Sequence, residues 1–133
     1  MNFTVKGSEL PPVELVVEPA RVRDYVNAVH GTDVELNGMA PATLWFGPTL
    51  EGSVDIARYL DIDHAKGLLG ETVYEIVRPP KVGEQLTARI AISDMFTKES
   101  SKGTNSFAIL DVRFLDTSDE LVCSQRVTFI ERG

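Results

Sequence analysis

The sequence has 133 residues, of which 43% are hydrophobic and 25% are charged, a composition typical of a single globular domain spanning residues 1–133. Its net charge of −7 argues against a general nucleic-acid binder, which needs a basic face. No apolar run approaches the roughly 20 residues that cross a bilayer, and the first residues lack the apolar core of a signal peptide. One cysteine, Cys123, fits a reducing compartment, so we expect a cytoplasmic protein in which this thiol is buried.

The first half of the chain predicts one strand and two helices. Residues 13–17 (VELVV) are typical of a short strand, and Pro19 suits the first turn of a helix because its missing N–H is not needed there. An apolar stripe at helical spacing then predicts a helix over 19–30. Residues 31–42 contain two glycines and a proline and indicate a loop. A second helix, apolar over most of its circumference and therefore buried, is expected over 48–60.

The second half of the chain predicts strands. Residues 67–84 indicate a strand, a turn at Arg78-Pro79-Pro80 and the start of a second strand. Period-two alternation then predicts strands at 86–96 and 108–114, each with one dry face, and a last strand at 121–130. The inward positions should be Leu86, Ala88, Ile90, Ile92 and Phe96 in one strand, and Ala108, Leu110, Val112 and Phe114 in the next. Polar turns are expected at 97–105 and 116–120, and consecutive strands with such turns indicate an antiparallel meander.

Three stretches carry a resemblance to a known family. They are Val17-Glu18-Pro19 with the helix RVRDYVNAV, the turn Ala40-Pro41-Ala42-Thr43, and the segment LLGETVYEIVRPPKVGEQLTARIAI. In this order and spacing they resemble the MaoC-like branch of hot-dog proteins, and most of all its N-terminal-type (FAS1-like dehydratase) domain. The resemblance implies an α+β hot-dog fold, with about five antiparallel strands wrapped around the helix at 48–60.

The same resemblance locates the segment where catalytic members carry their chemistry. Their loop reads Gly-Asp-any-Asn-Pro-any-His, with the Asp and His handling the water and the α-proton. Counted from Tyr25, these two positions fall on Gly31 and Leu36, and a shift of two residues places them on Asp33 and Gly38. Neither register contains both residues. Two possibilities therefore stay open: other residues of this chain transfer the proton, or a partner subunit supplies the pair.

Three residues are candidates for catalysis. His30 and Asp33 form the nearest approach to an acid–base pair, although a histidine at a helix C-terminus and an aspartate in a turn have structural explanations too. Glu51 resembles the helix carboxylate of other hot-dog dehydratases and thioesterases, or stabilises the first helical turn. Residues that could line an acyl pocket, or belong to the core, are Tyr25, Thr43, Trp45 and Phe46.

The function implied by the resemblance is hydration of a 2-enoyl thioester or dehydration of a 3-hydroxyacyl thioester, as an enzyme or as the substrate-binding subunit of one. Backbone N–H groups at the start of the central helix would polarise the thioester carbonyl. The alternative is a hot-dog acyl-CoA thioesterase. We expect no cofactor and no metal, with coenzyme A or an acyl carrier protein carrying the substrate, and a homodimer or a heterodimer with a MaoC-like subunit. An acidic carrier protein would need a local basic patch, which Lys98 and Lys102 could form.

Overall fold

The computed structural model describes residues 1–30, 38–40 and 55–133. Its elements, in chain order, are the 3-10 helix η1 (Phe3–Val5), strand β1 (Val13–Val16), helices α1 (Pro19–His30) and α3 (Ile56–Tyr59), and strands β2 (Gly67–Ile76), β3 (Gln85–Ser100), β4 (Gly103–Leu115) and β5 (Leu121–Glu131).

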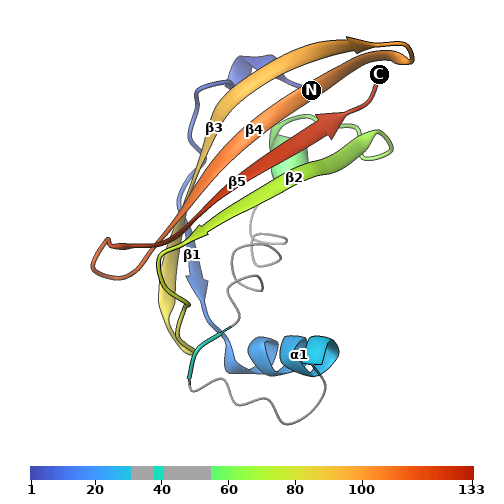
Figure 1. Ribbon diagram of the computed structural model, residues 1–133. Helices are drawn as coiled ribbons and strands as arrows, with labels where there is room; N and C mark the ends of the chain where they lie inside the picture. The colour runs from blue at the N-terminus through green and yellow to red at the C-terminus, as the bar shows by residue number, and fades with distance from the viewer. Residues whose placement is uncertain (31–37, 41–54) are drawn as a thin grey trace.

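The five strands form one antiparallel sheet in the order β1-β3-β4-β5-β2. Figure 1 shows a single curved layer, with α1 beyond the end of the sheet near β1 and both chain termini at the opposite end. The α+β class with about five antiparallel strands is the one that the sequence predicts, and this prediction is confirmed.

The expected meander is confirmed only for β3, β4 and β5. β2 pairs with β5, whereas β3 pairs with β1 and β4, so β2 and β3 are not neighbours. The meander prediction was therefore wrong for the strands on either side of residues 78–84, which are not neighbours in the sheet. The segment after β2 carries the chain across the end of the sheet, because the positions next to β3 are taken by β1 and β4.

The dry face of the sheet is as predicted except at one position. Leu86, Ala88, Ile90 and Ile92 are buried, but the next buried residue of β3 is Met95 rather than Phe96. A shift in the register between Ile92 and Asp94 inserts one extra residue into β3. Such a bulge reverses the alternation beyond it, so Phe96 lies on the outer face, where its ring stacks on that of Phe107.

The polar segment 97–105 is mostly strand, which corrects the prediction of a turn there. β3 and β4 pair up to Ser100 and Gly103, which leaves Ser101 and Lys102 as a two-residue turn. The Oγ of Ser100 donates to the carbonyl of Gly103 at 2.7 Å and accepts from the N–H of Lys102 at 3.2 Å. Gly103 has φ 128°, a backbone conformation that favours glycine. The predicted turn at 116–120 is present.

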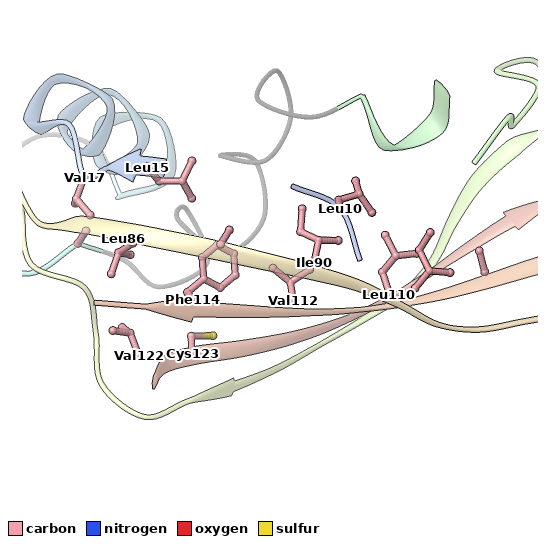
Figure 2. Packing of buried hydrophobic residues seen from close by; sticks show 14 of the residues in the cluster. Leu10, Leu15, Val17, Leu86, Ile90, Leu110, Val112, Phe114, Val122 and Cys123 are labelled. Carbon is pink, nitrogen blue, oxygen red and sulfur yellow. The ribbon is translucent and has the colours of Figure 1, made fainter. Parts of the chain in front are cut away.

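The hydrophobic core lies on the inner face of the sheet. Leu10 and Leu15 approach the face that carries Ile90 and Phe114, as Figure 2 shows. α1 contributes Val22 and Val26, and Leu60 after α3 is fully buried. Burial of a side chain of this size contributes about 1.5–3 kcal/mol. These three residues therefore belong to the same core cluster as the inner face of the sheet.

The two predicted helices have different outcomes. α1 has the predicted bounds, although Val29 at the end of its apolar stripe is exposed. Of the helix expected over 48–60, residues 48–54 lie outside the described residues, and Ile56–Tyr59 is helical as α3. Asp55 caps α3, since its carboxylate accepts from the N–H of Arg58 at 2.9 Å. No helix within the described part of the chain is long and apolar enough to cross a membrane.

An ion-pair network fixes the segment between β2 and β3. The Arg78 guanidinium donates two hydrogen bonds to the carboxylate of Glu84 and a third, at 3.2 Å, to Asp116 in the β4–β5 turn. Glu84 also accepts from the N–H of Lys81 at 2.8 Å. The hydrogen bonds from Arg78 are the main reason why the pKa of Glu84 lies below its ordinary value. This network links two turns that are distant in sequence.

Candidate active site

The structure describes only part of the predicted site. Tyr25 is half-buried on α1 and packs against the core, as expected of a core or pocket residue. His30 is the last residue of α1. The remaining predicted residues lie outside the described part of the chain: Asp33, Thr43, Trp45, Phe46 and Glu51.

Residues 38–40, which lie in the sequence between two of these predicted residues, Asp33 and Thr43, form a short backbone bridge with residues 80–82. The N–H of Ala40 donates to the carbonyl of Pro80 at 2.8 Å, and the N–H of Val82 donates to the carbonyl of Gly38 at 2.7 Å. Met39 thereby pairs with Lys81. The chain at 38–40 is thus attached to the segment that Arg78 and Glu84 fix, at the end of the sheet near β1.

Gln125 is the one polar residue among the described residues whose side chain is buried, with 6% of its surface exposed. Its Nε2 donates to the hydroxyl of Tyr74 at 3.4 Å. Its Oε1 has no hydrogen-bond partner among the described residues. Exchange of the two amide atoms would leave the nitrogen in that position instead. One amide atom of Gln125 is therefore available to a ligand or to a water molecule.

Gln125 belongs to a cluster of neutral polar groups on the inner face of the sheet. Tyr74 lies opposite Gln125 in β2, and Cys123 precedes it on the same face of β5. Burial raises the pKa of the Tyr74 phenol above 10.0, with smaller contributions from Cys123 and Tyr25. Burial also raises the pKa of the Cys123 thiol to about 12. We call Tyr25, Tyr74, Cys123 and Gln125 the inner-face cluster.

The inner-face cluster can bind polar groups of a substrate but has no strong base. At neutral pH the phenol of Tyr74 and the thiol of Cys123 keep their protons, because burial disfavours their anions. Phenol and amide groups can donate hydrogen bonds to a carbonyl or hydroxyl oxygen. Proton abstraction at neutral pH needs a group that has already lost its proton, such as a carboxylate or a neutral imidazole, and the cluster contains neither. Within the described residues no group of acidic, histidine and cysteine side chains is arranged to hold a metal.

The sequence-based prediction included Tyr25 but missed Tyr74 and Gln125. A signal for Gln125 is nevertheless present, because it lies between Cys123 and Val127 at an inward position of β5 where alternation calls for an apolar residue. Tyr74 carries no comparable signal, since a tyrosine is common in strands.

The free edge of β2 is a second feature with functional meaning. Among the described strands, β2 pairs with β5 alone, and apolar side chains along it are exposed. They are Leu68, Leu69, Val73, Ile76 and, just beyond the strand, Val77. An edge strand offers unpaired N–H and C=O groups to another chain, and proteins usually protect such an edge with charges or a cover. An edge with this many exposed apolar residues is typical of an interface.

Residues 4–125 match the model of the FAS1-like dehydratase domain region. The chain belongs to this family. The match extends over the inner-face cluster and nearly all of the sheet, and it confirms the resemblance found in the sequence. No curated protein matches the chain.

Solved structures support the same fold. A chain of the truncated HadBC (3R-hydroxyacyl-ACP dehydratase) complex from Mycobacterium tuberculosis has a TM-score of 0.74 at 16% identity, with 95% of this chain and 96% of that chain covered. A chain of the ChsH1–ChsH2 complex from the same organism has a TM-score of 0.71 at 15% identity, covering 92% and 83%. The (R)-hydratase from A. caviae has a TM-score of 0.67 at 12% identity, covering 93% and 94%. At these identities the structures establish the hot-dog fold.

Proposed function

We propose that this FAS1-like dehydratase domain binds an acyl thioester for hydration of a 2-enoyl chain or dehydration of a 3-hydroxyacyl chain. The observation that carries the proposal is the buried amide of Gln125, which has one atom without a partner among the described residues and lies beside the neutral phenol of Tyr74. A buried polar atom of this kind lowers the stability of the folded protein unless it forms a hydrogen bond. In a member of a dehydratase family, the oxygen atoms of the thioester substrate are suitable ligands.

The chemistry divides between binding and proton transfer. A donor from the inner-face cluster would hold the thioester carbonyl or the 3-hydroxyl, and one well-placed donor to a developing oxyanion contributes about 3 kcal/mol. His30 and Asp33 are the candidates for moving the proton between water and the α-carbon, while a partner subunit would take this role if they do not. Substrates on coenzyme A and on an acyl carrier protein are both compatible with this division.

We also assign the free edge of β2 to a partner of the same fold. Main-chain hydrogen bonds from a second edge strand would satisfy the open edge, and the exposed apolar residues would add contact area. Two of the similar structures are complexes of two named components, HadBC and ChsH1–ChsH2. We therefore propose a hot-dog dimer in the cytoplasm, formed with a second copy or with a related subunit.

The test is hydration of crotonyl-CoA by the purified chain, alone and mixed with a candidate MaoC-like subunit that carries the Asp and His pair. Activity that falls at least a hundredfold in His30→Ala or Asp33→Ala would place proton transfer in this chain. His64→Ala is the matched control, because His64 is exposed in the turn before β2. Activity that needs the partner and ignores both substitutions would identify a binding subunit. Release of free coenzyme A that depends on Glu51, without hydration, would contradict the proposal and indicate a thioesterase.

A further inference from the structure

A pocket with a volume of about 530 Å³ lies on the outer face of the sheet, at the end where the chain termini lie. Its floor is an apolar row across three strands, formed by Leu68 of β2, Ile130 of β5 and Phe107 of β4. These residues are register partners, since Leu68 lies opposite Ile130 and Phe107 lies opposite Ile130 on the other side. Because Phe107 stacks on Phe96, the floor continues into an aromatic pair.

The rim of this pocket is positively charged. Lys66, Lys102 and Arg132 line it, and none of the three forms an ion pair with another described residue. A carboxylate at Gly133, which also lines the pocket, would cancel only one of these charges. In addition, the Lys98 ammonium lies 5.5 Å from the centre of the Phe107 ring. A local excess of cations in a chain with a net charge of −7 stands out from its surroundings.

The backbone holds these cations in place. The N–H of Arg132 donates to the carbonyl of Lys66 at 3.2 Å, so the two residues lie side by side. Lys102 belongs to the tight β3–β4 turn, where its N–H donates to the Oγ of Ser100. Two acidic strand residues that are sequence neighbours of pocket residues lie on the opposite face: Glu99 accepts from the hydroxyl of Thr104, and Glu131 pairs with the Met1 amino group at 3.0 Å. Glu71 lies on the outer face of β2, and no ion pair joins it to the three cations of the rim.

We propose that this pocket binds a nucleoside phosphate. The cations suit phosphate groups, and the partly exposed Phe107 ring with its apolar neighbours suits the face of a base. The volume is in the range of small-molecule sites. Inorganic phosphate alone would leave the apolar floor unused, and a nucleic acid would be repelled by the acidic remainder of the chain.

The pocket is separate from the inner-face cluster. Leu68 and Tyr74 are six residues apart in β2, about 20 Å at the usual rise of a strand, and they lie on opposite faces. The inference therefore does not depend on the proposed hydro-lyase activity. Two sources could provide the ligand, namely a free adenine nucleotide or the adenosine 3′,5′-bisphosphate end of a coenzyme A thioester.

Calorimetric titration of the intact chain with adenosine 3′,5′-bisphosphate, coenzyme A, ATP, adenosine and inorganic phosphate tests this inference. We expect at least one of the three nucleotides to bind at least tenfold more tightly than adenosine or phosphate alone. Lys102→Glu and Arg132→Glu should each weaken the binding at least tenfold. Lys81→Glu is the matched control, because Lys81 is an exposed lysine at the other end of the sheet. Circular dichroism verifies that each variant is folded.

The outcomes separate the sources and the alternatives. Tighter binding of coenzyme A and adenosine 3′,5′-bisphosphate than of ATP would support a thioester carrier, and the reverse order would support a free nucleotide. The proposal is overturned if no nucleotide binds, if phosphate binds as tightly as the nucleotides, or if Lys81→Glu weakens binding as much as the rim variants. Loss of affinity for an acyl carrier protein in the rim variants, without nucleotide binding, would also overturn it.

Discussion

Gln125 is a residue whose side chain lowers the stability of the fold and offers a hydrogen-bonding atom to a substrate. Its amide is buried beside Val127 and Cys123, and one amide atom has no partner among the described residues. A buried polar atom without a partner costs about 1–3 kcal/mol. Such a cost is easier to understand at a binding site than in a purely structural core.

We predict that Gln125→Met raises the free energy of unfolding by up to about 1 kcal/mol while it lowers hydration or substrate binding at least tenfold. Methionine has a similar shape and removes the unsatisfied amide. Urea denaturation and the crotonyl-CoA assay measure the two effects. Met95→Leu, an apolar exchange at a buried position of β3, serves as the control and should change neither strongly. A loss of stability together with unchanged activity would show that Gln125 is structural.

At this scale the sequence predicted the inward residues of two strands and failed where a local irregularity intervened. Alternation alone identified Ile90, Ile92 and Phe114 as buried. It could not identify Phe96 as an outer residue, because the alternation of residues 86–92 does not indicate that a bulge follows between Ile92 and Asp94. The sequence pattern indicates that Gln125 lies at an inner position of its strand. Whether its amide atoms have hydrogen-bond partners depends on neighbouring strands, which the pattern does not show.

Elements were predictable where local signals marked their ends. α1 has the predicted bounds because Pro19 favours a helix start and Val22 and Val26 give it a buried side. β2 begins at Gly67, a residue type with poor strand propensity, because Gly67 pairs with Glu131 of β5, and Gly70 lies at a shift in the register between the two strands. Strand pairing is a property of the whole sheet, so the local pattern did not predict the position of β2.

The segment between β2 and β3 depends on Arg78. We predict that Arg78→Met lowers the free energy of unfolding by about 1–2 kcal/mol at pH 7, a modest value because Arg78 is a third exposed. The pKa of Glu84 is lower in the folded chain than its ordinary 4.5, so the stabilisation is present above that value and disappears as the pH falls through the folded pKa.

The difference between Arg78→Met and the parent chain should accordingly shrink when urea denaturation is repeated from pH 7 to pH 3. Arg113→Met provides the comparison, because Arg113 is an exposed arginine on β4 without an ion pair among the described residues. An equal loss at both pH values would show that packing of the arginine stem, rather than its charge, is responsible.

On the scale of the whole molecule, the two edges of the sheet differ. β1 is a short edge of four residues, whereas β2 is a long edge with exposed apolar side chains. A strand of another chain would pair with β2 rather than with β1, because each added pair of residues contributes main-chain hydrogen bonds.

We predict that Val73→Lys reduces the assembled species to the 14.6 kDa monomer, because a lysine on an edge strand opposes pairing. Analytical ultracentrifugation of the chain, alone and mixed with a candidate MaoC-like subunit, measures the mass. Val16→Lys is the matched control, since Val16 is a similarly exposed valine on β1, 47% against 45% for Val73. Dissociation by Val16→Lys but not by Val73→Lys would place the interface on the opposite edge.

The strand order also has a consequence for how the chain folds. β1 and β2, the first two strands in sequence, occupy the two edges, while the centre is built from β3, β4 and β5. Neither edge strand has a sheet to join until the later strands exist, so the antiparallel set at 85–131 is the expected nucleus. During synthesis the early strands must wait without partners, and the apolar residues of β2 are then available to other chains. Rapid capture of β2 by β5 would therefore protect the nascent protein from aggregation.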